Sequence, residues 1–201
     1  MVHTFSLGML WFMSQQEPVY VNAAPVLAEQ EIPKKAIYGT PAQIIIPSLG
    51  INLLVEPGRY EASTNSWTLS SYNAHFATMT NPANDTEGNT FIYGHNNPYV
   101  FGPIKRIQPG AGVEIVTTNG NRFFYTYKES YIVAPNDVSL FKYEGMPILT
   151  VQTCTGAWNE KRQLYEFSFE KVIESTEQTV TKAAAGKQAV LSAIGSQLPA
   201  N

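Results

Sequence analysis

The stretch VEIVTTNGNRFFYTYKESYIV, residues 113–133, decides the fold class. Two runs rich in β-branched and aromatic residues, 113–117 and 122–133, flank the dipeptide Asn119-Gly120. This dipeptide can supply the positive φ angles that a tight hairpin requires. The stretch therefore predicts an antiparallel β-hairpin.

Similar short runs of strand-forming residues recur on both sides of this hairpin, between Pro and Gly turn signals. They lie at 43–46, 52–55, 90–93, 148–154 and 164–172. Short strands that recur between turns are typical of a β-barrel or a β-sandwich. The sequence therefore predicts one all-β domain over residues 41–173.

The two flanking segments differ in character from this domain. Residues 1–40 contain an apolar run, 5–13, which is shorter than the roughly 20 residues that a bilayer-spanning helix needs. We interpret this segment as a truncated membrane anchor followed by a Pro-punctuated linker. Residues 174–201 carry apolar side chains at helical spacing, which predicts an appended C-terminal helix.

Composition narrows the classes of function. A net charge of −3 gives no basic field to neutralise phosphates, so a nucleic-acid partner is not expected. Hydrophobic residues make up 44% of the chain, enough for a sizeable core. The chain has one cysteine, Cys154, which rules out an internal disulfide and a zinc site of paired cysteines.

Cys154 ends a predicted strand, on the face that also carries the polar residues Thr150 and Gln152. The connection 155–161 is short, so Cys154 and Arg162 should lie on neighbouring strands. The alternation of the last strand places Arg162 opposite its aromatic face. A guanidinium beside a thiol favours the thiolate and can stabilise an oxyanion.

His95 follows the run 90–93 through Gly94, and strand ends commonly present catalytic side chains. His95 is therefore our candidate for the acid and base that serves the thiol. His3 lies in the expected N-terminal flank, outside the domain. His75 is the alternative, without a comparable position at a strand end.

The segments 90–95 and 149–154, followed by Arg162, resemble in the same order the His, Thr-x-x-Thr-Cys and Arg motifs of the sortase family. The run 43–51 is similar to the opening strand of that family. The resemblance covers about residues 41–173. The connection after the cysteine fits no particular sortase class, so the class stays open.

This resemblance implies an eight-stranded β-barrel with short helices and the activity of a cysteine transpeptidase. Sortases cut a sorting signal, usually similar to Leu-Pro-x-Thr-Gly, between Thr and Gly, and an amine resolves the thioacyl enzyme. By resemblance, Cys154 attacks the scissile carbonyl, and His95 protonates the leaving amine and activates the incoming one. Arg162 holds substrate and oxyanion, and Thr153 contacts the substrate.

The resemblance also implies partners and a location. The partners are surface proteins that carry a sorting signal and an amine acceptor, either a cell-wall precursor or a pilin lysine. We expect an extracytoplasmic protein of the bacterial cell surface, held at the membrane through its N-terminal segment. The chain ends in Leu-Pro-Ala-Asn, residues 198–201, which resembles the start of a sorting signal with Asn where Thr is usual. Chance is enough for so short a match at a chain end, and occupancy of the active site by this tail is the alternative.

No metal or organic cofactor is expected, because acyl transfer through a thiol needs none. Asp85 and Glu87 invite comparison with sortases that bind calcium. Two carboxylates nevertheless fall short of the six to eight oxygen ligands that calcium takes.

Two other functions stay open on the sequence. Residues 152–156, Gln-Thr-Cys-Thr-Gly, approach the caspase pattern around the nucleophile, which would make the chain a cysteine protease. The third possibility is a non-catalytic surface binding module, in which Cys154 is merely buried.

Overall fold

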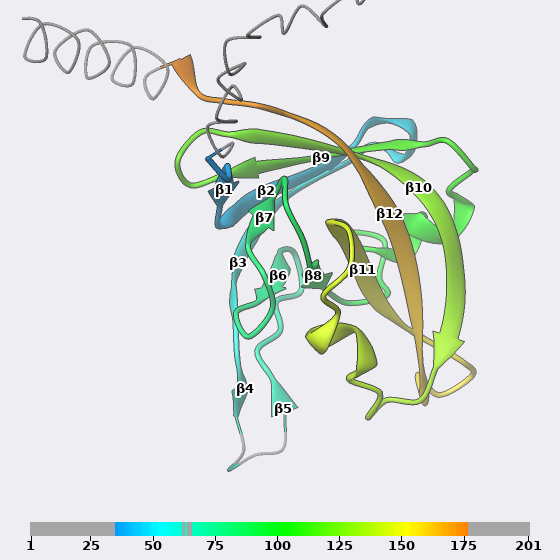
Figure 1. The fold of residues 1–201 in the computed structure, drawn as a ribbon. Coiled ribbons are helices and arrows are strands. Elements are labelled where there is room, and N and C mark those ends of the chain that lie inside the picture. The colour runs from blue at the N-terminus through cyan, green and yellow to red at the C-terminus, as the bar shows by residue number, and fades with distance from the viewer. Residues whose placement is uncertain (1–34, 62, 64–65, 177–201) are drawn as a thin grey trace, which may run out of the picture. The chain divides into compact units, whose positions relative to one another are not determined.

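Residues 35–61, 63 and 66–176 are described by the structure, a computed structural model of the chain. Eight of their strands form a closed barrel in the order β10-β12-β11-β8-β6-β3-β2-β9 (Figure 1). This confirms the expected eight-stranded all-β fold. The apolar run 5–13, most of the C-terminal segment and the last four residues of the chain lie outside the described residues.

The barrel strands include each of the runs predicted from sequence. Their bounds are β2 Pro41–Ile46, β3 Ile51–Gly58, β6 Ala74–Ala77, β8 Asn89–Tyr93, β9 Gly112–Thr117, β10 Arg122–Val133, β11 Ile148–Thr155 and β12 Lys161–Ile173. Two short pairs lie outside the barrel, β1 Tyr38–Gly39 with β7 Ala83–Asn84, and β4 Tyr60–Glu61 with β5 Ser66–Trp67. Three 3-10 helices join the described strands, η1 Pro47–Leu49, η2 Gly102–Arg106 and η3 Ser139–Lys142.

The predicted hairpin is confirmed, because β9 and β10 pair antiparallel, with Arg122 opposite Val116. At its turn Gly120 takes a φ of +80°, which a residue with a side chain rarely adopts. One glycine, rather than both residues of the Asn-Gly pair, therefore supplies the left-handed conformation.

The pairing of β8 with β11 is parallel, with Gln152 opposite Tyr93. Two parallel strands that pair side by side present their carboxyl ends at the same edge of the sheet. The residues that follow Tyr93 therefore lie beside the end of β11, where Cys154 stands. This arrangement brings two distant parts of the sequence to one end of the barrel.

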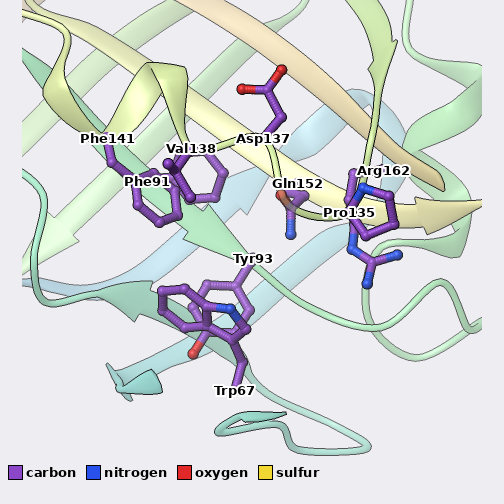
Figure 2. A pocket seen from close by; sticks show the side chains of 9 residues that line it. All are labelled: Trp67, Phe91, Tyr93, Pro135, Asp137, Val138, Phe141, Gln152 and Arg162. Carbon is purple, nitrogen blue, oxygen red and sulfur yellow. The ribbon is translucent and has the colours of Figure 1, made fainter. Parts of the chain in front are cut away.

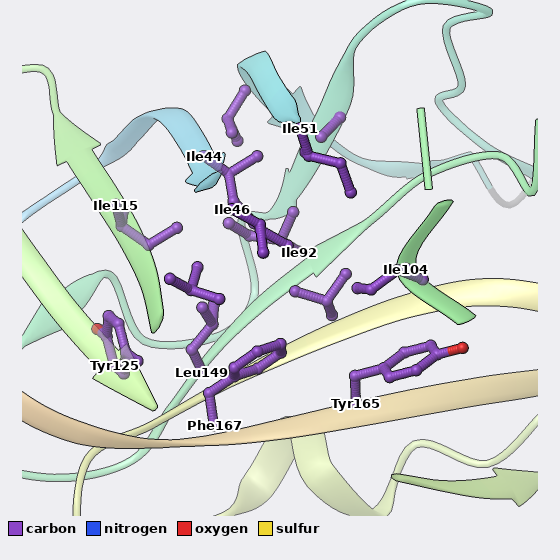
Figure 3. Close-up of a cluster of buried hydrophobic side chains, with 14 of the residues drawn as sticks. Ile44, Ile46, Ile51, Ile92, Ile104, Ile115, Tyr125, Leu149, Tyr165 and Phe167 are labelled. Carbon is purple, nitrogen blue, oxygen red and sulfur yellow. The ribbon is translucent and has the colours of Figure 1, made fainter. Parts of the chain in front are cut away.

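The interior of the barrel is filled by branched and aromatic side chains (Figure 3). Ile92 on β8, Leu149 on β11 and Phe167 on β12 are each 0% exposed. Burying such a side chain contributes about 1.5–3 kcal/mol relative to leaving it in water. Alternate residues of β8 and β11 are thereby locked inward, and their neighbours must face outward.

A second, smaller cluster lies on the outer face of the barrel. Phe91, Tyr93 and Leu164 are buried there together with Ala77. Partly buried side chains from β5, β10 and η3 pack against them: Trp67, Tyr131, Val133, Leu140 and Phe141. None of the helices in the described part of the chain has the length and apolarity that a membrane span requires.

Candidate active site

Cys154 is half-buried near the end of β11, directly opposite Arg162 on β12. Residues paired in this way project from the same face of a sheet. The thiol and the guanidinium therefore stand on neighbouring strands, as the alternation and the short connection predict. Gln152, two residues earlier on β11, shares this outward face.

The backbone that carries His95 is held on both sides. The amide of Gly94 donates to the carbonyl of Gln152 at 3.1 Å, which continues the β8–β11 ladder past the end of β8. The hydroxyl of Thr153 donates to the carbonyl of Gly94 at 3.0 Å. The carbonyl of His95 in turn accepts from the amide of Phe101 at 3.0 Å.

Gly94 is required by close packing rather than by a special backbone angle. A Cβ at this position would lie 2.7 Å from Cγ1 of Val100 and 3.1 Å from the ring of Phe101. Only a residue without a side chain lets the backbone before His95 approach that closely. The Gly-His pair noted in the sequence thus has a steric cause.

Thr153 lies beneath the site, with 4% of its surface exposed. Its hydroxyl already donates to the backbone next to His95. The contact between Thr153 and substrate that the sequence suggested stays a prediction.

His95 and Cys154 line one polar hollow of about 220 Å³. Its other lining residues carry amides and a hydroxyl: Ser71, Asn96, Asn97 and Asn159. Asn97 ties the rim together, because its side-chain Nδ2 donates to the carbonyl of Ser71 at 3.1 Å. A thiol and an imidazole that line the same hollow are the components that an activated nucleophile needs.

A second, smaller pocket of about 50 Å³ lies on the same face (Figure 2). Its lining is mostly aromatic and apolar and comprises Trp67, Phe91, Tyr93, Pro135, Asp137, Val138, Phe141, Gln152 and Arg162. The ring of Trp67 meets that of Tyr93 at 5.2 Å and that of Phe141 at 5.7 Å. Burial raises the pKa of the Tyr93 hydroxyl, so this part of the wall stays neutral.

This apolar pocket was not predicted from the sequence as a site. Trp67 comes from the short β4–β5 pair and Phe141 from η3, and neither element is long enough to show a periodic pattern. The one available sign was composition, since aromatic residues stay frequent in the connection between β10 and β11.

Arg162 stands between the two hollows, because its side chain lines the apolar pocket while Cys154, opposite it, lines the polar one. Its Nη1 donates to the carbonyls of Asn159 and Lys161, both at 3.0 Å. Asn159 takes a φ of +58°, a left-handed conformation that asparagine tolerates. The loop before β12 and the first residue of β12 therefore hold Arg162 by one nitrogen.

His75, the alternative histidine, is 1% exposed and lines neither hollow. It lies on β6, opposite Tyr93, with its ring stacked on the tyrosine ring at 5.6 Å. Burial, as the largest cause, lowers the pKa of His75. Of the histidines that the structure describes, His95 alone lines the hollow of the thiol.

No three His, Cys, Asp or Glu side chains come together as metal ligands within the described ranges. Oδ1 of Asp85, one of the two carboxylates considered for calcium, accepts from the amide of Ile37 at 2.8 Å. This bond ties the segment before β1 to the loop after β7.

Known proteins that are similar to this chain agree on one family. A family model described as Sortase domain matches residues 44–188. Among solved structures, sortase A from Listeria monocytogenes is 24% identical, with a TM-score of 0.54 over 72% of this chain and 96% of its own. The SrtA sortase from Actinomyces oris is 20% identical, with a TM-score of 0.56 over 72% of this chain and 87% of its own.

A third similar structure is sortase E1 from Streptomyces coelicolor with a tripeptide in its active site. It is 19% identical, with a TM-score of 0.54 over 67% of this chain and 90% of its own. At these identities the structures establish the shared fold. No curated protein matches the chain.

Proposed function

Because the chain belongs to the sortase family of cysteine transpeptidases, we propose that it cleaves a sorting signal similar to Leu-Pro-x-Thr-Gly and transfers the acyl group to an amine. The observation that carries this proposal is the shared hollow of His95 and Cys154. Arg162 stands opposite the thiol on the next strand. A nucleophile, an acid and base, and a cation for the oxyanion are thus available at one end of the barrel.

In the first step the thiolate of Cys154 attacks the carbonyl carbon of the scissile amide, and negative charge develops on the carbonyl oxygen. The C–N bond then breaks, and protonated His95 gives its proton to the leaving amine. The acyl group is left on sulfur as a thioester. In the second step neutral His95 takes a proton from the incoming amine, whose nitrogen attacks the thioester and releases the thiolate.

Arg162 is proposed to stabilise the charge on the carbonyl oxygen and to hold the substrate backbone. A guanidinium has five N–H donors in a fixed plane. The two bonds to the carbonyls of Asn159 and Lys161 both use Nη1, so Nε and Nη2 are the nitrogens that we assign to the substrate. Thr153, bonded to the carbonyl of Gly94, is proposed to support the backbone of His95 from below.

The two hollows suggest how the peptide lies. Gln152 in the apolar pocket and Cys154 in the polar hollow are on the same face, about 7 Å apart along the strand. We assign the apolar residues that precede the scissile bond to the pocket around Trp67 and Tyr93. The polar hollow then receives the leaving amine and afterwards the acceptor amine.

Sortases act outside the cytoplasm on surface proteins, and this gives the proposal its partners. The acyl donor is a surface protein that carries the signal, and the acceptor is an amine of a cell-wall precursor or of a pilin lysine. Attachment of the enzyme to the membrane through its N-terminal segment belongs to the same proposal.

The test is mass spectrometry of the purified protein with a panel of Leu-Pro-x-Thr-Gly-like peptides, with and without glycine or diaminopimelate as the amine. We expect an adduct that is absent from Cys154→Ala and that the amine converts into a ligated product. Hydrolysis that no amine changes would identify a cysteine protease instead. No adduct with any peptide of the panel would favour a binding module.

A further inference from the structure

His75 stands in a row of side chains that crosses three strands of the barrel. Its neighbours at the same level are Glu56 on β3 and Tyr93 on β8. Tyr93 belongs to the outer-face cluster and lines the apolar pocket. His75 therefore stands directly beside the wall of the candidate site.

The surroundings of His75 suit a neutral ring. It is 1% exposed, and neither ring nitrogen has a hydrogen-bond partner among the described residues. Its ring lies at 27° to that of Tyr93, which is close to parallel stacking. Placing a charge in such a position without a bonded partner is strongly unfavourable.

The ring of Tyr93 connects His75 to His95 along the chain. Tyr93 and His95 are two residues apart, and the ladder to β11 continues through Gly94 between them. Side chains two apart on a strand share a face. The placement of the Tyr93 ring therefore bears on the strand end from which His95 projects.

The charges around His75 agree with this placement. The pKa of His75 is lowered by burial first of all, is raised by the carboxylate of Glu56 and is lowered again by the charge of His95. The titratable groups that face His75 are thus Glu56 on β3, Tyr93 on β8 and His95 just beyond it. A positive charge on His95 thus disfavours protonation of His75.

We propose that His75 is a positioning residue for His95. The neutral ring of His75 braces Tyr93 and the end of β8, and protonation of His75 in acid disturbs that support. The inference rests on the proposed function in one respect, the role of His95 as acid and base. The stacked ring supplies the support at neutral pH. Protonation of His75 sets the lowest pH at which the stacked arrangement of His75 and Tyr93 persists.

Three variants separate the ring from its charge. His75→Ala removes the ring, and His75→Phe keeps a flat ring that cannot be protonated. Glu56→Gln keeps an oxygen for the bond from Nδ2 of Asn73, at 2.7 Å, and removes the charge that favours protonated His75. Thermal unfolding of each variant shows whether it is folded at the temperature of the assay.

The activity measurement is peptide-to-amine transfer from about pH 5 to about pH 8. We expect His75→Ala to lower kcat about tenfold at neutral pH with little change in KM, because orientation rather than peptide binding is lost. His75→Phe should keep the wild-type kcat at neutral pH and retain more activity at the acid end of this range, because burial lowers the pKa of His75 below its ordinary value. Glu56→Gln should move the acid limb of the profile to lower pH.

A second measurement needs no peptide and so separates this inference from the proposed function. The rate of alkylation of Cys154 by iodoacetamide is followed against pH in the wild type, His95→Ala, His75→Ala and His75→Phe. We expect His75→Ala to shift the profile in the direction of His95→Ala. His75→Phe should leave it unchanged at neutral pH.

Three results would overturn the inference. The first is a His75→Ala protein with wild-type kcat and alkylation profile. The second is a folded His75→Phe protein as impaired as His75→Ala, which would show that the nitrogens rather than the ring are needed. The third is an acid limb of the pH profile that lies at the same pH in His75→Phe as in the wild type. Should His75→Ala not fold, His75→Phe and Glu56→Gln still decide the matter.

Discussion

The two faces of β8 and β11 are built from alternate residues of the same strands, yet they have different roles. The inward face, with Ile92 and Val151 fully buried, is mostly apolar and closed. The outward face carries Tyr93 and Cys154 and is covered only in part, by short elements. The barrel wall thus packs the core on one side and carries the candidate reactive surface on the other. Substitutions on the inward face should therefore lower stability, whereas substitutions on the outward face should lower activity.

The largest effect is expected at the reactive surface, for His95→Ala. Loss of the acid and base should reduce transfer about 10²–10⁴-fold, because general acid-base catalysis is worth that much. The side chain is only half-buried, so the unfolding temperature should stay near that of the wild type. Single-turnover transfer and thermal unfolding of the same preparation check both parts. Retained activity would return His75 to consideration as the acid and base.

The matched change on the inward face is Ile92→Ala, at the neighbour of Tyr93. It should lower the free energy of unfolding by about 2–5 kcal/mol, because it removes buried methyl groups and leaves a cavity. The remaining folded protein should alkylate at Cys154 with the wild-type pH profile. Urea unfolding gives the first quantity. If Ile92→Ala changed the pH profile of alkylation but not the free energy of unfolding, the inward face would contribute to the site directly, and the contrast between the two faces would not hold.

Local pattern is enough to predict one half of the reactive surface. Alternation along β11 and β12, with the short loop between them, places Cys154 opposite Arg162. The other half depends on the parallel pairing of β8 with β11, in which Thr153 bonds to Gly94 from 59 positions away. No local pattern encodes such a pairing. The position of His95 after a strand made it a candidate, and the family motif supported it, but only the fold brings it to the hollow of the thiol.

The covering elements were beyond prediction for a related reason. All four residues of β6, Ala74–Ala77, are buried, so the strand shows no alternation. Trp67 meets Phe141 only because β5 and η3 converge on the same patch of the barrel. Short elements of this kind take their place from tertiary packing rather than from intrinsic propensity.

Trp67→Ala tests whether these covering elements serve peptide binding. Removing the indole opens the apolar pocket, so KM for the peptide should rise about tenfold with kcat nearly unchanged. The matched control is Trp158→Ala, because Trp158 is 89% exposed and lines neither hollow. Steady-state transfer kinetics distinguish the two variants. Equal KM values for both would remove the pocket from the proposed path of the signal.

The smallest effect concerns acid stability and His75. Its pKa in the folded protein is lowered from an unperturbed value of about 6.5, chiefly by burial. Below that value the unfolded chain binds a proton that the folded chain resists, so stability present above about pH 6.5 is lost as the pH falls towards the folded pKa. His75→Phe removes this contribution, and its unfolding temperature should fall less between neutral and mildly acidic pH than that of the wild type. Thermal unfolding at both pH values measures the two falls. If they are equal, the outer face accommodates a charge at His75, and its burial there differs in kind from that of the closed inward face.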